Sequence, residues 1–298
     1  MKALVTGATG LVGRELLRRL EHPVVLTRDV AESERRLGSE VRAWAWQPSR
    51  DPAPAAAFEG VDVVFHLAGE PVADGRWTAE RKQRIRDSRV LGTRHLVATL
   101  AKSSALPRVL ICASGVDFYG HRGDAELREG TAKGQGFLSD VCEAWEAEAR
   151  VAEGYGVRVV MARLGLVLAL RGGALARMLP PFRLGIGGKL GDGRQWLPWV
   201  HLDDAVGLLL HAAHDERLRG PLNVVAPEAV TNAEFTRALG QALGRPAVLP
   251  VPRLALRVVF GEISQALLDS RRVVPGVALE THYEFRYPRL APALASCV

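Results

Sequence analysis

The opening residues alternate between short apolar runs and one amphipathic stretch, which is the pattern of strand, helix and strand. Residues 2–6 and 24–27 are short apolar runs, and residues 14–20 carry leucines at helical spacing. A strand that is buried on both faces gives such a run, whereas an amphipathic helix has a period of about 3.6 residues. This segment therefore predicts the first half of a βαβ unit.

Apolar and helical patterns continue through the rest of the chain. Further strands are expected at 61–67 and 220–225, and helices at 137–146, 231–244 and 254–268. The helix at 231–244 begins at a capping box formed by Thr231 and Glu234. Strands that alternate with helices favour an α/β fold, and we expect a doubly wound parallel sheet.

Three glycines separate the first predicted strand from the first predicted helix. Gly7 permits a tight turn, Gly10 lets the backbone approach a pyrophosphate, and Gly13 lets the helix pack against the strand. The N–H groups at the start of the helix then face the anion. The strand, helix and second strand around them favour a dinucleotide site over glycines that merely form a turn. The candidate residues of this loop are Thr6, Gly7, Gly10, Leu11, Val12 and Gly13.

The end of the second strand distinguishes the two nicotinamide cofactors. An NAD site usually has an acidic residue there, which binds the ribose hydroxyls. In this chain the strand ends at Thr27 and Arg28, whose hydroxyl and guanidinium suit a 2′-phosphate. Asp29 follows one residue later and would serve as the NAD-type acid if the strand were shifted in register. We favour NADP(H).

The charge balance does not indicate a polyanionic partner. The chain has 298 residues, with 39 Lys and Arg against 33 Asp and Glu, and a formal net charge of +6. Basic residues are scattered among acidic ones and never form a run of five or more. This arrangement predicts a solvated basic surface and no nucleic-acid partner.

The cysteine and histidine positions argue against disulfides and metal. Cys112, Cys142 and Cys297 are far apart, and His211 and His214 have no third ligand beside them. No apolar stretch approaches about 18 residues, so we expect no membrane span. We expect a cytoplasmic protein that acts on a small-molecule substrate, and its oligomeric state is open, a homodimer included.

Several motifs resemble the extended short-chain dehydrogenase/reductase superfamily. They are T-G-A-T-G-x-x-G at 6–13, H-L-A-G at 66–69, V-x-G-T at 90–93 and S-G-V-D-F-Y-G at 114–120. Longer strings, such as G-F-L-S-D-V-C-E-A-W-E at 136–146, are similar to an atypical subgroup of NAD(P)-binding, epimerase-like proteins. The resemblance implies a Rossmann domain over 1–165 and 197–226. It also implies a smaller C-terminal α/β substrate domain over 166–196 and 227–298.

The resemblance also implies further cofactor contacts. Leu67, Ala68 and Gly69 match a turn whose backbone faces the adenosine and ribose, and Val167 matches a position near the nicotinamide. Arg89 stands where related chains usually have asparagine. Its guanidinium would reach a cofactor phosphate or hydroxyl, or it would form a surface ion pair with Asp87.

The catalytic residues of the superfamily are missing from this chain. Related dehydrogenases use a tyrosine four residues before a lysine, together with a serine, to move a proton. None of the four tyrosines here has a lysine four residues later. The resemblance places Gly136 and Asp140 at the tyrosine and lysine positions, and Gly115 at the serine position. Standard dehydrogenase or epimerase chemistry is therefore in doubt.

Three residues are candidates for the missing proton chemistry. Ser114 adjoins the lost serine position and would bond a substrate or the nicotinamide amide. Asp140 and Glu143 lie on the expected helix, and in a dry cleft either would become a general acid. The alternative is that these carboxylates only balance the helix dipole.

A glycine-rich segment over 172–199 carries prolines, basic residues and the two tryptophans Trp196 and Trp199. We expect either a long loop that covers a planar or phosphorylated ligand, or a buried loop held by its tryptophans. The leading hypothesis is an NADP(H)-dependent oxidoreductase or epimerase-like enzyme that acts on a small polar metabolite. The alternative is a protein that binds NADP(H) as a redox sensor or scaffold without turning it over.

Overall fold

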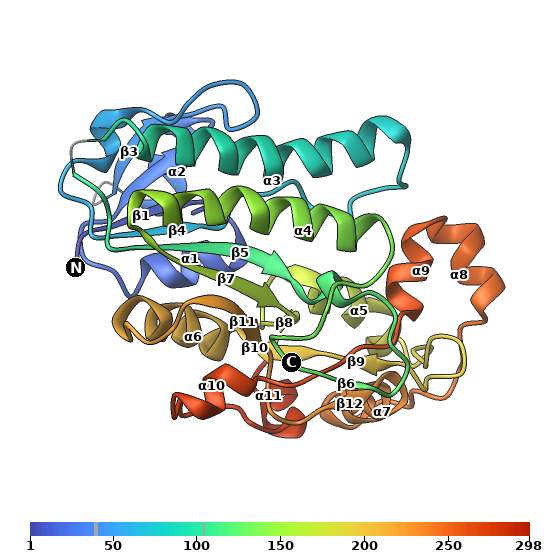
Figure 1. Ribbon diagram of the computed structural model, residues 1–298. Helices are drawn as coiled ribbons and strands as arrows, with labels where there is room; N and C mark the ends of the chain where they lie inside the picture. Colours follow the sequence, from blue (N-terminus) through green and yellow to red (C-terminus); the bar gives the residue numbers. More distant parts are fainter. Residues whose placement is uncertain (39–40, 104) are drawn as a thin grey trace.

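A seven-stranded parallel sheet forms the centre of the computed structural model, which describes residues 1–38, 41–103 and 105–298 (Figure 1). In sheet order the strands are β11 (Gly220–Val224), β7 (Arg158–Leu164), β5 (Val109–Gly115), β4 (Val63–His66), β1 (Ala3–Thr6), β2 (Val24–Thr27) and β3 (Arg42–Ala45). The chain starts at the centre with β1 and builds outward to either side. The strand order therefore reverses beside β1, and ligands of open α/β sheets bind at such a switch point.

Helices cover both faces of this sheet, as Figure 1 shows for α3 and α4 above it and α6 below it. The helices are α1 (Leu11–Leu17), α2 (Val30–Leu37), α3 (Ala79–Leu100), α4 (Phe137–Arg150), α5 (Gly173–Arg183), α6 (Leu202–His214), α7 (Asn232–Leu243), α8 (Arg253–Phe260), α9 (Ile263–Leu268), α10 (Gly276–Glu280) and α11 (Leu290–Ala295). Single-turn 3₁₀ helices are η1 (Ala55–Phe58), η2 (Val116–Tyr119) and η3 (Val151–Tyr155). The expected doubly wound Rossmann architecture is confirmed.

Two hydrophobic cores lie on the opposite faces of the sheet because successive strand residues point to opposite sides. Val5 of β1 belongs to the core that includes Leu16 of α1 and Leu209 of α6. Leu4, its neighbour in the strand, belongs to the core that includes Leu96 of α3 and Trp145 of α4. The continuous apolar runs of the sequence thus correspond to strands that are buried on both faces.

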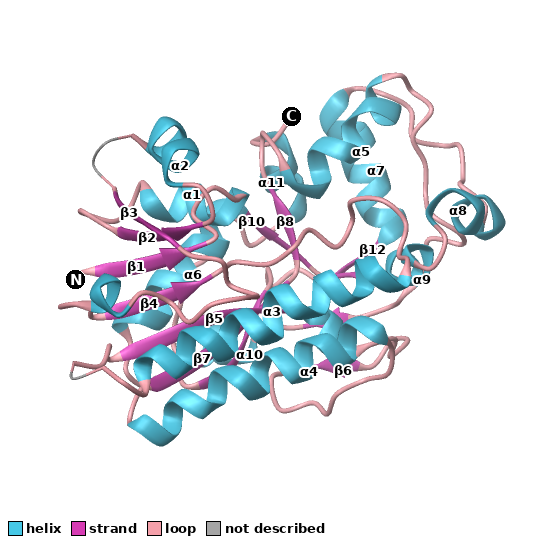
Figure 2. Ribbon diagram, turned by 90° about the horizontal axis from the view of Figure 1, so that it is seen from above, coloured by secondary structure: helices cyan, strands magenta, loops and turns pink. Residues whose placement is uncertain are grey.

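A third core joins segments from the second half of the chain. It packs Leu175 of α5, Phe235 of α7 and Leu294 of α11 around the buried Trp199. Three two-stranded sheets belong to this half or tie it to the first: β8 (Leu166–Leu168) with β10 (Trp199–His201), β9 (Trp196–Leu197) with β12 (Val230–Thr231), and β6 (Glu126–Leu127) with β13 (Arg272–Val273). In Figure 2, α5, α7, α8 and α9 lie beyond the carboxyl ends of the main strands.

Two sequence expectations about local structure were wrong. Residues 172–199 are not one long loop, because Leu175, Leu179 and Phe182 recur at helical spacing and bury one face of α5 despite the prolines within it. Residues 254–268 form two helices, α8 and α9, and not one. Gly261 between them adopts φ +62°, a conformation that ends a helix and favours glycine. No helix in the described residues is long and apolar enough to cross a bilayer.

Candidate functional site

The glycine loop between β1 and α1 is packed so closely that side chains would not fit in it. Gly7 adopts φ +69°, and a Cβ there would lie 2.7 Å from the backbone carbonyl of Leu67. A Cβ at Gly13 would lie 2.4 Å from the carbonyl oxygen of Gly7. These contacts explain why the sequence has glycine at both positions, and they bring the ends of β1 and β4 together.

Buried hydroxyl and imidazole groups hold these two strand ends in place. The Thr6 hydroxyl accepts hydrogen bonds from the N–H groups of Leu67 and Ala68, each over 3.1 Å. It donates to Nδ1 of His66 over 2.8 Å, because the other ring nitrogen bonds Thr93, whose own hydroxyl donates to a backbone carbonyl. Burial lowers the pKa of His66 from 6.5 to about 4, so this imidazole is neutral and structural.

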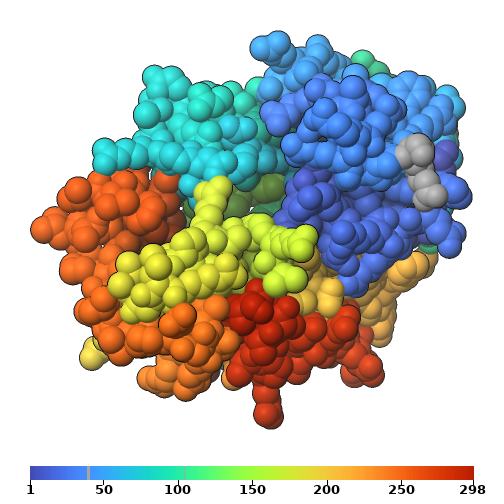
Figure 3. Space-filling view, turned by 180° about the vertical axis from the view of Figure 1, so that it is seen from behind, coloured from blue at the N-terminus to red at the C-terminus, as the bar shows by residue number. Residues whose placement is uncertain are grey.

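A cleft of about 290 Å³ opens in front of the glycine loop. Its lining comes from residues 7–10, residues 26–28 with Ser33, Trp46 with Pro48, residues 67–71, and Ser88. On the face seen in Figure 3, the surface is hollowed between the blue N-terminal residues and the yellow segment around α5. Seven of the predicted positions, among them Gly7, Arg28 and Gly69, thus meet in one cleft at the switch point of the sheet.

At the end of β2, the acidic side chain has a partner in the protein, whereas the basic side chain has none among the described residues. Asp29 caps α2, since its carboxylate accepts the N–H of Glu32 over 2.9 Å. Arg28 lines the cleft and is exposed, and among the described residues it forms no ion pair. The Thr27 hydroxyl accepts a hydrogen bond from Ser33 over 2.6 Å and donates to the Asp29 carbonyl. This strand end therefore presents the Arg28 cation to a ligand, while the nearby carboxylate and both hydroxyl protons are already used within the protein.

Arg89 lies beneath the cleft and not on the outer surface. Its guanidinium donates to the carbonyl of Glu70 over 2.9 Å and stacks on the Trp145 ring at 5.1 Å. It lies 3.1 Å from where a Cβ on Gly69 would be. The ion pair with Asp87 that the sequence left open is absent from the described structure, where the amide of Gln83 donates to Asp87 instead.

The remaining predicted cofactor positions lie near the start of α1. A Cβ on Gly173, at the start of α5, would lie 2.8 Å from the Leu11 side chain and 3.7 Å from the Val167 carbonyl oxygen. Val167 is the middle residue of β8 and is paired with Val200 of β10. Val12 packs against the core beneath the sheet. Leu11 and Val167 therefore both lie close to the start of α5.

Ser114 takes part in a buried polar network rather than facing the cleft. Its hydroxyl donates to Oε1 of Glu146 over 2.7 Å. Arg163 binds both oxygens of that carboxylate, each over 2.8 Å, and also donates to the Tyr119 hydroxyl over 2.9 Å. Tyr119 donates in turn to Asn223 over 2.7 Å. Every member is buried, so the hydroxyl of the candidate serine is already occupied.

Asp140 and Glu143 are surface carboxylates. Both form ion pairs with Lys133, at 2.6 and 3.0 Å, and 58% of each side chain is exposed. A carboxyl group that acts as a general acid needs a dry cleft, which this exposed position on α4 does not provide. The structure instead supports the alternative of solvated charges near the start of the helix.

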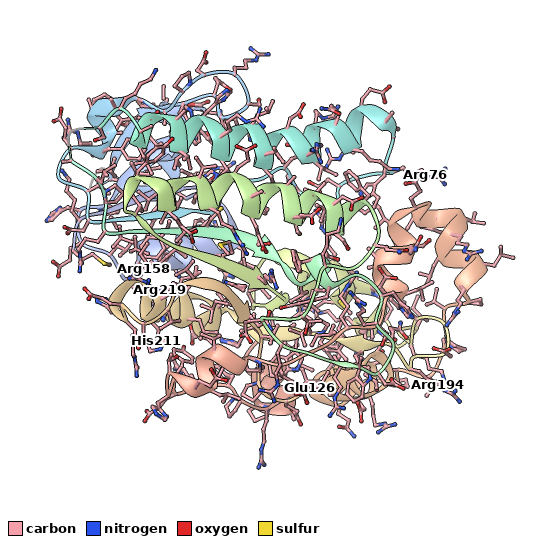
Figure 4. All side chains as sticks on the ribbon, in the orientation of Figure 1. Arg76, Glu126, Arg158, Arg194, His211 and Arg219 are labelled. Atoms are coloured by element: carbon pink, nitrogen blue, oxygen red, sulfur yellow. The ribbon has the colours of Figure 1, made fainter. Side chains whose placement is uncertain are left out.

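The basic and aromatic residues of 172–199 do not converge on one ligand. Trp199 is buried in the third core and donates to the Glu228 carbonyl over 2.9 Å. Trp196 donates to Asp124 over 2.8 Å, whereas Lys189 lines a separate groove beside α7. Arg194 lies at the edge of the molecule in Figure 4, away from the cleft.

A second cavity, which no sequence pattern indicated, lies between the start of α4 and α9. Asp117 and Arg271 form an ion pair of 2.9 Å in its wall. Asp117 stands within the S-G-V-D-F-Y-G motif, so the sequence already showed an acidic residue at this point. Its partner Arg271 comes from a distant part of the chain, and no local pattern indicated that the two would pair. Within the described ranges, no group of three or more His, Cys, Asp or Glu side chains is placed to hold a metal ion.

Comparison with known proteins gives matches along nearly the whole chain. Residues 3–225 match the NAD dependent epimerase/dehydratase family, and residues 251–297 match a domain of unknown function, DUF1731. Epimerase family protein SDR39U1 of Mus musculus is 39% identical over 306 residues, covering 100% of both chains. Epimerase family protein Mb2239 of Mycobacterium bovis is 38% identical, covering 97% of this chain and 95% of its own.

Solved structures show the same similarity in three dimensions. The human epimerase family protein SDR39U1, determined with NADPH, superposes with a TM-score of 0.90 at 34% identity and covers 100% of this chain and 99% of its own. A nucleoside-diphosphate sugar epimerase from Corynebacterium glutamicum has a TM-score of 0.79 at 33% identity. It covers 100% of this chain and 58% of its own.

Proposed function

Since this chain belongs to the NAD-dependent epimerase/dehydratase family, we propose that it is an NADP(H)-dependent oxidoreductase or epimerase-like enzyme that acts on a small polar metabolite. The observation that carries the proposal is the end of β2, where Arg28 lines the cleft without an ion pair among the described residues while Asp29 caps α2. A 2′-phosphate would supply the anion that Arg28 lacks, whereas an NAD-type role for Asp29 would remove a helix cap.

The cofactor would lie along the cleft from β2 towards β8. Its proposed contacts are Thr6, Gly7, Gly10, Leu11, Val12, Gly13, Thr27, Arg28, Leu67, Ala68, Gly69, Arg89 and Val167. Thr6 acts through the backbone of Leu67 and Ala68, which it positions, and Arg89 acts from beneath Gly69. When bound, the cofactor supplies hydride transfer. The solved relative with NADPH supports this choice of cofactor.

We assign the cofactor to residues 1–165 and 197–226, and the substrate to residues 166–196 and 227–298. The two large cores of the first region flank the main sheet, and the third core belongs mostly to the second region. Arg76, labelled in Figure 4, donates to the Val258 carbonyl of α8 over 2.5 Å and so links the two regions beyond the strand ends.

One observation favours the second candidate, an NADP(H)-binding sensor or scaffold. The tyrosine and lysine positions of the superfamily hold Gly136 and Asp140, and the hydroxyl of Ser114 is bonded to Glu146. Neither Ser114 nor the exposed Asp140 and Glu143 has the surroundings of a proton donor. A sensor would need none.

Two measurements test the proposal. Titration of the full chain with NADPH and NADH should show tighter binding of NADPH, and equal affinity would contradict the phosphate assignment. Absorbance at the NADPH band is then followed with a panel of sugars, aldehydes, ketones and quinones. Oxidation of NADPH by any member supports the enzyme, whereas tight NADPH binding without turnover across the panel supports the sensor.

A further inference from the structure

The second cavity, of about 180 Å³, lies where β5 leads into η2 and α9 covers the start of α4. Figure 1 shows α8 and α9 beyond the arrowhead of β5, beside the loop that leads into α4. The residues that matter in its wall are Trp77, Asp117, Gly136, Ser139, Asp269 and Arg271. Because ligands bind beyond the carboxyl ends of parallel strands, this position suits a substrate. Gly136 contributes no side chain and leaves space there.

Arg271 has hydrogen-bonding capacity that the protein does not use. The residue is only 7% exposed, yet its Nη2 alone contacts both Asp117 and Asp269, each at 2.9 Å. Its Nε is buried and has no partner among the described residues. Buried donors are rarely left unpaired without a reason. A ligand oxygen in the cavity would give this guanidinium a further acceptor.

Asp117 supplies an acceptor next to this donor. Its Oδ1 faces Arg271, whereas Oδ2 lies 3.5 Å from where a Cβ on Gly115 would be. The backbone is fixed as well, because the Ser139 hydroxyl donates to the Asp117 carbonyl over 2.7 Å. Oδ2 therefore lies near the end of β5, outside the ion pair with Arg271, where it can accept a hydrogen bond from a ligand hydroxyl.

The charge of the wall is negative. Asp117, Asp269 and Glu262 line the cavity against the single guanidinium of Arg271. Glu262 is paired outside with Lys82, and the two aspartates share Arg271, while Asp269 also faces Nδ1 of His121 at 3.8 Å, a ring that is charged only when protonated. Burial raises the pKa of Asp269, so the charged form of this carboxylate is disfavoured in the wall. An anionic group entering it would be repelled by carboxylates only partly balanced by one cation.

We propose that this cavity binds an uncharged, hydroxyl-bearing small molecule, whose hydroxyl donates to Asp117 Oδ2 and whose second oxygen accepts from Arg271. Phosphate- and carboxylate-bearing compounds are rejected. The inference rests on the proposed function, because it names the substrate class of that site. A volume of about 180 Å³ has room for a small ligand such as a three-carbon polyol or hydroxyketone. Asp117 is then the residue placed to accept the hydrogen bond of the ligand hydroxyl.

The test uses the NADPH-saturated full chain and three probes with the same number of non-hydrogen atoms. Glycerol and dihydroxyacetone are neutral, and lactate is an anion. Binding is measured by saturation-transfer NMR. We expect the neutral probes to bind at least about ten-fold more tightly than lactate. Stronger binding of lactate, or no binding of either neutral probe, would overturn the proposal.

Substitutions in the cavity wall test whether these residues cause the preference for neutral probes over lactate. Asp117→Asn keeps the shape of the side chain and removes one negative charge. It should therefore lower the affinity for dihydroxyacetone and reduce the ratio of the dihydroxyacetone affinity to the lactate affinity. Asp215→Asn is the matched control, because Asp215 is also an arginine-paired aspartate, bonded to Arg217 over 2.6 Å, but lies far from the cavity. An affinity ratio between dihydroxyacetone and lactate that is unchanged in Asp117→Asn would contradict the proposed role of Asp117. Equal changes of this ratio in Asp117→Asn and Asp215→Asn would contradict it as well.

The NADPH affinity of each protein is measured separately. Wild-type protein that binds NADPH but does not discriminate among the probes contradicts this inference alone. Wild-type protein that fails to bind NADPH contradicts the proposed function, and the probes are then titrated without cofactor. Arg271→Lys provides a second variant that preserves the charge, and it should bind dihydroxyacetone less tightly because it lacks the planar fork.

Discussion

The Ser114 hydroxyl donates a hydrogen bond to Glu146 across the interface between β5 and α4, over 2.7 Å. The Glu146 carboxylate is in turn held by both Nε and Nη2 of Arg163. Side chains of the ion pair are only 2% and 4% exposed, so the serine hydroxyl completes the solvation of a buried charge. Ser114 therefore stabilises the fold, although its sequence context suggested catalysis.

Replacing Ser114 by alanine should lower stability without affecting the cofactor. The substitution removes one donor from a buried carboxylate, which costs about 1–3 kcal/mol in the free energy of unfolding. Urea unfolding measures this loss, and NADPH titration should give an unchanged dissociation constant. Ser49→Ala, at an exposed position, is the control and should change neither quantity. Loss of NADPH binding in a folded Ser114→Ala protein would restore a role at the site.

Replacing Arg28 by alanine should weaken the binding of NADPH but not the binding of NADH. A charge-assisted contact to phosphate contributes about 1.5–3 kcal/mol, which corresponds to an increase of about 10- to 100-fold in the dissociation constant. Binding of NADH should be unchanged, since it lacks the 2′-phosphate. Arg245→Ala, which removes an exposed arginine from the groove beside α7, should leave both affinities as they are. Equal losses for both cofactors would argue against a phosphate contact.

Replacing Gly13 by alanine should disrupt the loop that faces the cleft. The added Cβ would lie 2.4 Å from the Gly7 carbonyl oxygen, so the start of α1 must move. We expect NADPH affinity to fall at least about ten-fold, with a lower melting temperature. Gly123→Ala is a contrasting variant, because φ there is +57° but nothing lies near its Cβ. It should strain the backbone and leave NADPH affinity unchanged.

The buried His66 should make the protein less stable in acid. Its pKa is about 4 in the folded chain and 6.5 in the unfolded chain, so only the unfolded state takes up the proton between these values. Stability is therefore fully present above pH 6.5 and falls as the pH drops towards 4, by about 3 kcal/mol at most. Urea unfolding at several pH values measures the slope. His66→Gln should make the free energy of unfolding depend less steeply on pH than in the wild type. An identical slope in both proteins would rule out His66 as a cause of the acid sensitivity.

The parallel sheet and the glycine loop were predictable because their physical causes are local. Apolar runs identified β1, β2 and β4, and the spacing of Gly7, Gly10 and Gly13 identified the turn before α1. The end of β2 was identified in the same way, with Thr27 and Arg28 at the cleft. Each of these features depends on residues within one strand–turn–helix unit.

Local patterns were insufficient where partners come from distant segments. Ser114 and Glu146 are 32 residues apart, and nothing near the serine indicates that its hydroxyl is bonded to a carboxylate on α4. Asp140 and Glu143 lie on the expected helix, but which of its faces meets solvent depends on how α4 packs against the sheet. Composition alone also suggested a loop where the buried leucines of α5 favour a helix.

The sequence by itself determined the fold class, the glycine loop after β1 and the absence of a tyrosine–lysine pair, since all three depend on residue order. Only the tertiary structure decided which polar groups are free to act. Folding joins Ser114 to Glu146, exposes Asp140, and brings Asp117 against Arg271 from the far end of the chain. The reason is that a side chain's chemistry depends on its burial and partners, and those are set by contacts between segments that the sequence keeps apart.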